Sequence, residues 1–580
     1  MKSTIRKRGQ KFVRRFSRAS AKASEDSKEH IKENLIERLS HIANIRLLIL
    51  EWALLVTALI MLAVAQAFWF GNSYAENTFV DGGTYTEATL GDVNSMNPLF
   101  ATTSSEKTLS RLMFATLATT DYSGHSGIGL AQSITPSENG QAWKVRLRDD
   151  LKWSDGEPIT NADVLFTAKI IKNPLVNSIY DANLSNVKVS ENDVGEIVFE
   201  LPMAYADFIT ALSFPILPQH ILGEVDPETL IENSFSNAPV TSGAFNFNAV
   251  QTTSTPNGSE KVYYLSANPY YYKGQTMLNS FAVHTYNTKD DIINAINAGS
   301  VTATAELTET DAPRVNTGQF NMRESGINSG AFIFFNTSHE AVKNVEMRAA
   351  IRQGIDMGKI RAVAEETTPL DYPLLESQIK LENYPTLPGH DFDAAKNKIA
   401  ELSGNEAIHL DIATVNSGYL PGVAEAVKAE LEGLGFNVDV TVFEENQEFI
   451  NNVISKRAYD ILIYEIELGT DPDLLPYYHS SQTNSTGLNL SNYRNVLVDD
   501  LLLGARDALD NELRIKKYEA FLEHWVSEIP AIGIYQPNLT YYYNKNVRTF
   551  NDDVRLVVAL DRFVDINSWA VNKGTKNKTP

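Results

Sequence analysis

The sequence of 580 residues contains no cysteine. The chain therefore has no disulfides, no thiolate metal site, no cysteine nucleophile and no acylated cysteine as a lipid anchor. It also lacks a Walker A motif, a G-x-S-x-G elbow and an H-E-x-x-H motif, so nothing local indicates ATP hydrolysis or the common hydrolase chemistries. We predict no catalytic residues, no metal and no cofactor, and we expect a protein that is not an enzyme.

Outside the N-terminal arm, acidic residues greatly outnumber basic ones. Residues 1–46 carry thirteen Lys and Arg against five acids, a net charge of +8 within a chain of net charge −22. The remaining residues therefore carry −30. A body this acidic repels phosphate backbones, so we expect it not to bind nucleic acid.

One long apolar run follows this basic arm. Trp52–Phe70 reads WALLVTALIMLAVAQAFWF, contains no charge and has aromatic residues at both ends, as in a helix that crosses a bilayer. A cleaved signal peptide is the alternative, because AVAQA offers small residues to a peptidase. The preceding polar region is longer than that of a normal signal, so we predict an uncleaved single-pass anchor at residues 47–70. The arm would be cytoplasmic and the main body extracytoplasmic.

The stretch Leu151–Thr167, LKWSDGEPITNADVLFT, could hold a pair of catalytic carboxylates or could be a turn that leads into a helix. Asp155 precedes a glycine, which is typical of a tight turn. Asp163 stands three residues after Thr160, which predicts a capping box and a helix from about residue 161 to 172. Since both acids have local structural roles, we favour the structural interpretation.

Alternating and helical patterns along the rest of the chain predict a mixed α/β fold. Pro421–Leu434 has helical spacing of apolar residues, and Phe436–Phe443 alternates as a strand. With the strand that precedes them, these segments predict a parallel crossover.

Several of these segments occur, in order, in one known family. The sequence VRLRDDLKWSDGEPITNADVLFT (Val145–Thr167) resembles the signature of the family 5 extracellular solute-binding proteins, the peptide/nickel-type receptors of ABC importers. Asn161 replaces the usual alanine. The other matching segments are Leu90–Phe100, Ala238–Phe247, Tyr264–Gly274, Phe334–Ile360, Tyr459–Leu475 and Glu528–Phe550.

The resemblance implies an α/β, periplasmic-binding-protein-like fold with two lobes around a cleft and an extra subdomain, here preceded by one transmembrane helix. The segments that we predict are a basic arm (1–46), the anchor (47–70), a linker (71–80), lobe I (81–126, 239–328 and 531–572), the additional subdomain (127–238), lobe II (329–530) and a flexible tail (573–580).

The resemblance also implies where a ligand binds. In this family, ligand contacts come from the segment after an asparagine–proline turn and from the strand before an aspartate–proline pair. The corresponding residues are Thr102, Thr103, Ser104, Tyr464, Glu465, Ile466 and Glu467. Peptide-binding members often place an aspartate just before that pair to hold the ligand ammonium. Leu468 stands at this spacing, with Glu467 beside it.

The expected function is capture of oligopeptides by hinge closure and their delivery to the permease and ATPase subunits of an ABC importer. The protein would act as a monomer held to the membrane by its N-terminal helix. Three alternatives stay open: a non-peptide ligand such as a sugar oligomer or metal complex, a tethered surface sensor or adhesin, and an enzyme that uses the cleft.

Overall fold

The computed structural model describes residues 46–184, 186–205, 207–255, 258–364, 367–444, 447–485, 487–508 and 510–577. The chain divides into two units, Met1–Thr78 with Lys573–Pro580, and Phe79–Asn572. Most of the basic arm predicted at residues 1–46 lies outside the described residues.

The first unit contains helix α3 (Arg46–Tyr74), which covers the apolar run predicted to be helical. After it, β1 (Ala75–Val80) pairs with β21 (Asn572–Asn577) in a two-stranded sheet. A bilayer-spanning helix needs about 20 mostly apolar residues in succession, and no helix among the described residues is long and apolar enough to cross a membrane. The structure therefore does not support the transmembrane helix predicted at residues 47–70.

The second unit contains a seven-stranded mixed sheet that forms the base of lobe I. Strand β2 lies at its centre and pairs in parallel with β11 and β12, while the outer pairs are antiparallel. Helices α4 (Ser104–Met113) and α8 (Lys289–Ala298) contact this sheet. The strand order is β13 (Phe320–Gly326), β20 (Asn538–Asn544), β12 (Ala303–Thr304), β2 (Thr84–Leu90), β11 (Ser280–Tyr286), β10 (Gly258–Ala267) and β9 (Phe245–Thr255).

A four-stranded antiparallel sheet forms the additional subdomain. Gly156 has φ of +94° in the turn predicted there, and helix α5 (Asn161–Ile171) begins with the predicted capping box. The interpretation of this stretch as strand, turn and capped helix is confirmed. The strand order is β5 (Ala131–Pro136), β6 (Ala142–Leu147), β8 (Ile197–Glu200) and β7 (Lys188–Glu191).

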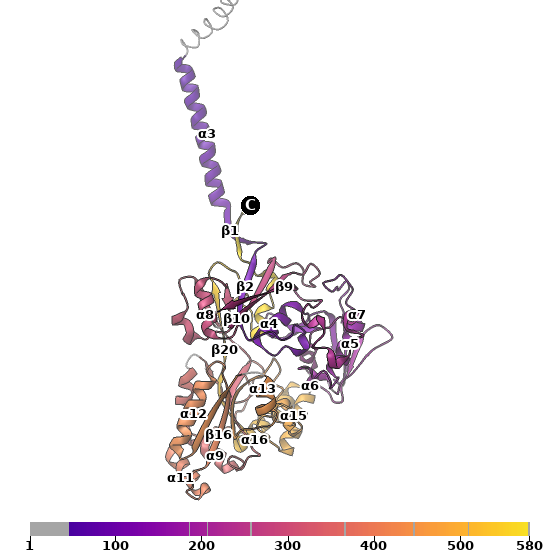
Figure 1. Ribbon diagram of the computed structural model, residues 1–580, viewed down its shortest axis with the longest axis vertical. Helices are drawn as coiled ribbons and strands as arrows, with labels where there is room; N and C mark the ends of the chain where they lie inside the picture. Colours follow the sequence, from indigo (N-terminus) through magenta and orange to yellow (C-terminus); the bar gives the residue numbers. More distant parts are fainter. Residues whose placement is uncertain are drawn as a thin grey trace, which may run out of the picture. The chain divides into compact units, whose positions relative to one another are not determined.

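Lobe II is built on a six-stranded sheet. Helix α12 (Leu420–Leu434) connects β16 to β17, which pair in parallel as the crossover pattern predicted. Helices α9 (Val345–Gly354), α11 (Phe392–Ser403), α12, α15 (Val496–Asp507) and α16 (Asn511–Glu528) gather around this sheet (Figure 1). The strand order is β15 (Thr368–Pro369), β19 (Ala531–Gln536), β14 (Ser329–Phe335), β18 (Ile461–Glu467), β16 (His409–Val415) and β17 (Asn437–Phe443).

The buried apolar side chains separate the two lobes. One large cluster contains residues from 331 to 535 only, and the other contains residues from 85 to 303 and from 539 to 569. Strand β19 pairs with β14, so it lies in lobe II, although the sequence-based division ends that lobe at residue 530. The other boundaries stay predictions.

Two short connections join the lobes. Residues 327–328 link β13 to β14, and Pro537 links β19 to β20. They lie side by side, because the Ile327 amide donates to the Pro537 carbonyl at 3.3 Å and Gln536 Nε2 donates to the Ile327 carbonyl at 2.8 Å. Paired connections of this kind give a hinge about which two rigid lobes can move.

Candidate ligand-binding site

A cavity of about 1170 Å³ is lined by residues of lobe I, the additional subdomain and lobe II. The wall formed by lobe I includes Thr102–Ser104 and one face of α4. The wall formed by lobe II includes Asn416, Ser417, Glu467, Gly469 and Thr470. Ligand pockets for small molecules typically measure roughly 300–1,000 Å³. This cavity is therefore large enough for a ligand bigger than a typical small molecule.

The N-terminus of α4 is fixed by a single buried carboxylate. Glu106 Oε2 accepts the amides of Thr102 and Thr103 at 2.8 and 3.1 Å, and its Oε1 accepts the amide of Asn94 at 2.8 Å. The Thr103 hydroxyl accepts the Glu106 amide in return, which completes a capping box. Glu106 thus holds the cavity-lining loop against the helix, and its carboxylate suits the positive end of the helix dipole.

A second carboxylate faces the cavity beside this helix end. Ser104 Oγ donates to Glu306, and both residues line the cavity. Burial raises the pKa of Glu306 above its ordinary value, while the bond from Ser104 and the nearby Arg562 guanidinium lower it and Glu87 raises it. Because burial outweighs the favourable partners, Glu306 accepts a proton more readily than an exposed glutamate.

On the lobe II side, Glu467 stands at the end of β18 and is exposed to the cavity. The chain turns directly after it, where Gly469 has φ of +69°, a conformation that glycine tolerates. The Gln378 and Asn328 side chains donate to the Leu468 and Gly469 carbonyls at 2.7 and 2.8 Å. These bonds fix the loop that presents Glu467.

The structure brings together four of the seven predicted ligand-binding residues. Thr102, Thr103, Ser104 and Glu467 line the cavity. Tyr464, Glu465 and Ile466 are not among its lining residues; Ile466 is buried, and the Tyr464 ring lies 5.9 Å from the Phe449 ring. A strand alternates its side chains between two faces, so Tyr464 and Ile466 lie on the opposite face of β18 from Glu467.

Sequence reasoning missed several lining residues that have usable signals. Lys107 and Arg111 are two of them: they stand three and seven residues after the predicted Ser104, a spacing that places them on the same face of α4 toward the cavity. Tyr180 lies between charges of both lobes. Burial raises its pKa to about 12, with Arg111 lowering it and Glu467 raising it. No local pattern marks Tyr180, because its neighbours come from distant parts of the chain.

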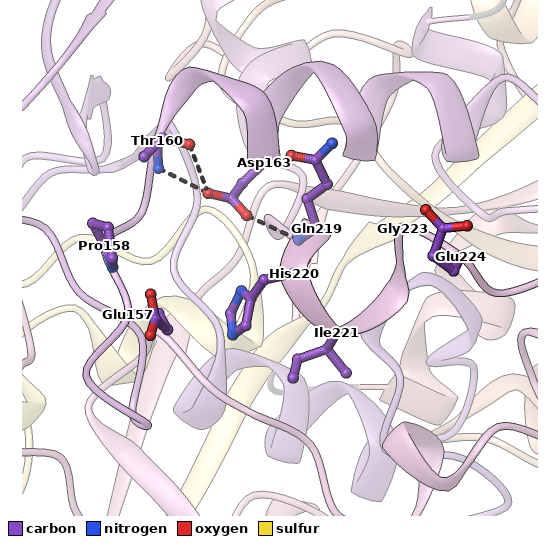
Figure 2. A pocket seen from close by; sticks show the side chains of 9 residues that line it. All are labelled: Glu157, Pro158, Thr160, Asp163, Gln219, His220, Ile221, Gly223 and Glu224. Carbon is purple, nitrogen blue, oxygen red and sulfur yellow. Dashed lines mark hydrogen bonds between the residues drawn. The ribbon is translucent and has the colours of Figure 1, made fainter.

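A smaller cavity of about 360 Å³ adjoins the capped helix of the subdomain. Figure 2 shows the bonds from the Thr160 and Gln219 amides to Asp163, at 2.8 and 2.9 Å. Nearby, His220 Nε2 lies 2.8 Å from Asp155 Oδ2. Both oxygens of Asp163 thus satisfy backbone donors, which supports its structural role.

Among the described residues, one group of side chains has the composition of a metal site. It consists of His409, Asp411 and Asp439, all exposed at the start of β16 and on the neighbouring strand β17. His409 Nε2 lies 3.2 Å from Asp411 Oδ1 and 3.7 Å from Asp439 Oδ2. All three side chains are exposed, and exposed groups of this kind are common without an ion.

Comparisons with known proteins agree with this architecture. The family model described as bacterial extracellular solute-binding proteins, family 5 middle, matches residues 128–487. The oligopeptide-binding protein AppA of Bacillus subtilis is 24% identical over 483 residues, which cover 79% of this chain and 87% of that protein.

Solved structures show the same fold. The structure of AppA from Bacillus subtilis in complex with a nonapeptide gives a TM-score of 0.73 at 22% identity, covering 85% of this chain and 100% of that one. NikZ from Campylobacter jejuni in complex with Ni(L-His) gives 0.71 at 21% identity, covering 84% and 99%. One fold therefore binds chemically different ligands.

Proposed function

Since the chain belongs to family 5 of the bacterial extracellular solute-binding proteins, we propose that its ligands are oligopeptides. Like the other members of this family, it is a substrate-binding protein of an ABC importer. It is not an enzyme. In the proposed cycle, a peptide enters the cavity between the open lobes, the lobes close about the hinge, and the closed form delivers the peptide to the permease.

The volume of the cavity carries the proposal of an oligopeptide. At about 1170 Å³ it exceeds the range of roughly 300–1,000 Å³ that is typical for small molecules. The relative AppA, which is named as an oligopeptide-binding protein and whose solved structure holds a nonapeptide, supports the same ligand class.

The cavity also offers a partner for a peptide amino group. Glu467 is exposed there and stands beside Leu468, the position at which peptide-binding relatives often carry an aspartate. We assign the ligand ammonium to Glu467, since a charge-assisted hydrogen bond is stronger than a neutral one. Lys107 and Lys289, from α4 and the start of α8, also line the cavity and are cations that suit carboxylates of the ligand.

Native mass spectrometry of the gently purified full-length protein tests the ligand class. We expect bound masses that fragment as peptides, and titration calorimetry with synthetic peptides of graded length should give saturable binding. Copurification of a metal–histidine complex or of a sugar oligomer, together with no heat from any peptide, would overturn the proposal. The same measurements include a nickel–histidine titration, because NikZ was solved with that ligand.

A further inference from the structure

Outside the cavity, an aromatic ring of the additional subdomain contacts lobe II. Tyr205 precedes the short helix η3 (Phe208–Leu212) of the subdomain, and Arg506 belongs to α15 of lobe II. The Arg506 guanidinium carbon lies 4.3 Å from the centre of the Tyr205 ring, close enough for a cation–π contact. This contact joins parts of the molecule that the hinge allows to separate.

Lobe II holds the arginine of this contact in a set of ion pairs. Arg506 pairs with Asp473 at 2.8 Å, and Arg514 of α16 donates to Asp471 Oδ2 at 2.5 Å. The side chains of Asp473 and Asp471 are only 9% and 7% exposed. Both arginine Nε atoms are buried without a hydrogen-bond partner among the described residues. The guanidinium groups are therefore fixed in place and largely desolvated, which strengthens their contact with an aromatic ring.

Asp207, two residues after Tyr205, faces the same cluster. The charged groups that act on it are Asp471, Arg514 and Asp473, and Arg506 with the phenols of Tyr205 and Tyr518 complete the cluster. The pKa of Asp207 is raised to about 7, chiefly by burial and also by Asp471 and Asp473, while Arg514 opposes the rise. Asp471 and Asp473 are already paired with Arg514 and Arg506. An ionised Asp207 therefore adds a third negative charge, which has no arginine of its own in this cluster.

The contact adjoins the ligand cavity on both sides. Thr210, in the same segment as Tyr205 and Asp207, lines the cavity, and so does Thr470, which precedes Asp471. A ligand that draws the lobes together would therefore also press this contact closed.

We propose that Tyr205 and Arg506 form a latch that holds the lobes closed, and that Asp207 makes the latch tighter in acid than in base. Tyr205, Arg506 and Asp207 act as positioning residues. They lie where the subdomain meets lobe II, and none of them lines the ligand cavity. The latch acts on the closure of the two lobes. Its effect on the affinity for peptides rests on the proposed function.

The direction of the pH effect follows from the two states of Asp207. Separation of the lobes exposes its carboxyl to water and returns its pKa toward the ordinary value of 3.8. The closed form then holds the proton more tightly, so closure is favoured as the pH falls through about 7 and is opposed above it. For one such group, the closed-to-open ratio should rise about tenfold from about pH 8 to about pH 6.

The absence of cysteine makes closure directly measurable. Two introduced cysteines are the only thiols in the chain, and Val194 of the subdomain and Val496 of lobe II are 78% and 75% exposed. Fluorophores attached through Val194→Cys and Val496→Cys report the distance between these parts by energy transfer. In the full-length protein without ligand, we expect the closed population to grow as the pH is lowered from about 8 to about 6.

Two variants and one control test the assignment. Asp207→Asn should remove this pH dependence and keep the closed fraction high, and Tyr205→Leu should lower the closed fraction at both pH values. Glu138→Gln, an exposed acid in a turn of the same subdomain, should behave as the unmodified protein. Unchanged pH dependence in Asp207→Asn, or an unchanged closed fraction in Tyr205→Leu, would overturn the latch.

Titration with a synthetic nine-residue peptide library separates this result from the proposed function. If the peptides bind, Asp207→Asn should bind at about pH 8 about as tightly as the unmodified protein binds at about pH 6. If no peptide binds while energy transfer still follows pH as described, the latch stands and the peptide proposal fails. If peptides bind while energy transfer ignores pH, the latch fails and the peptide proposal stands.

Discussion

At the scale of single residues, the fold depends on charges that are buried and paired. Arg562 donates to Glu87 Oε1 at 2.6 Å, Tyr541 donates to Glu87 Oε2 at 2.8 Å, and neither Arg562 nor Glu87 is more than 2% exposed. Removal of one partner leaves a buried charge uncompensated. We expect Arg562→Met to lower the free energy of unfolding by about 3–5 kcal/mol, measured by denaturant titration.

The control is an exposed ion pair of the same type. Arg314 lies 2.5 Å from Asp290, with side chains that are 52% and 71% exposed. Exposed pairs are screened by water, so Arg314→Met should lower the free energy of unfolding far less than Arg562→Met does. Equal losses in the two variants would contradict the role assigned to the buried pair.

Glu467 is the residue on which peptide recognition depends most directly. Replacement of its carboxylate by an amide removes the charge from the proposed bond to the ligand ammonium, a bond worth about 1.5–3 kcal/mol. We expect Glu467→Gln to weaken peptide binding by about tenfold to a hundredfold in titration calorimetry. Glu406→Gln, at an exposed site of lobe II, is the matched control. Equal affinity of the two variants would place the ammonium elsewhere.

At the scale of helices and strands, two capping carboxylates distinguish stability from binding. Asp163 caps α5 and does not line the large cavity, whereas Glu106 caps α4 and also holds the loop that lines it. A buried donor left without its acceptor costs about 1–3 kcal/mol. Asp163→Ala and Glu106→Gln should therefore both lower the melting temperature, but only Glu106→Gln should weaken ligand binding. Similar affinity losses in both would count against the assigned roles.

At the scale of the whole molecule, the ligand is expected to contact both lobes at once. Hydrogen–deuterium exchange with a saturating peptide should protect residues 101–104 of lobe I and 467–470 of lobe II together, because both line the cavity and closure buries them. Protection of one lobe only would move the binding site away from the cavity.

The sequence by itself determined the family, the fold class and the local elements, because caps, turns and alternation depend on neighbours within a few residues. The capped helix after Thr160 and the parallel crossover between β16 and β17 follow from such patterns. The prediction of a membrane span is not supported in the same way. The predicted segment is helical in α3, but no described helix is long and apolar enough to cross a membrane.

Only the tertiary structure decided which side chains meet. It placed Glu467 in the cavity and Tyr464, Glu465 and Ile466 outside its lining, because β18 is fixed between β14 and β16. It also brought Tyr205 to Arg506, residues that are about 300 positions apart in the sequence. Such contacts depend on the packing of whole elements, and packing is a property of the assembled molecule that local sequence patterns do not contain.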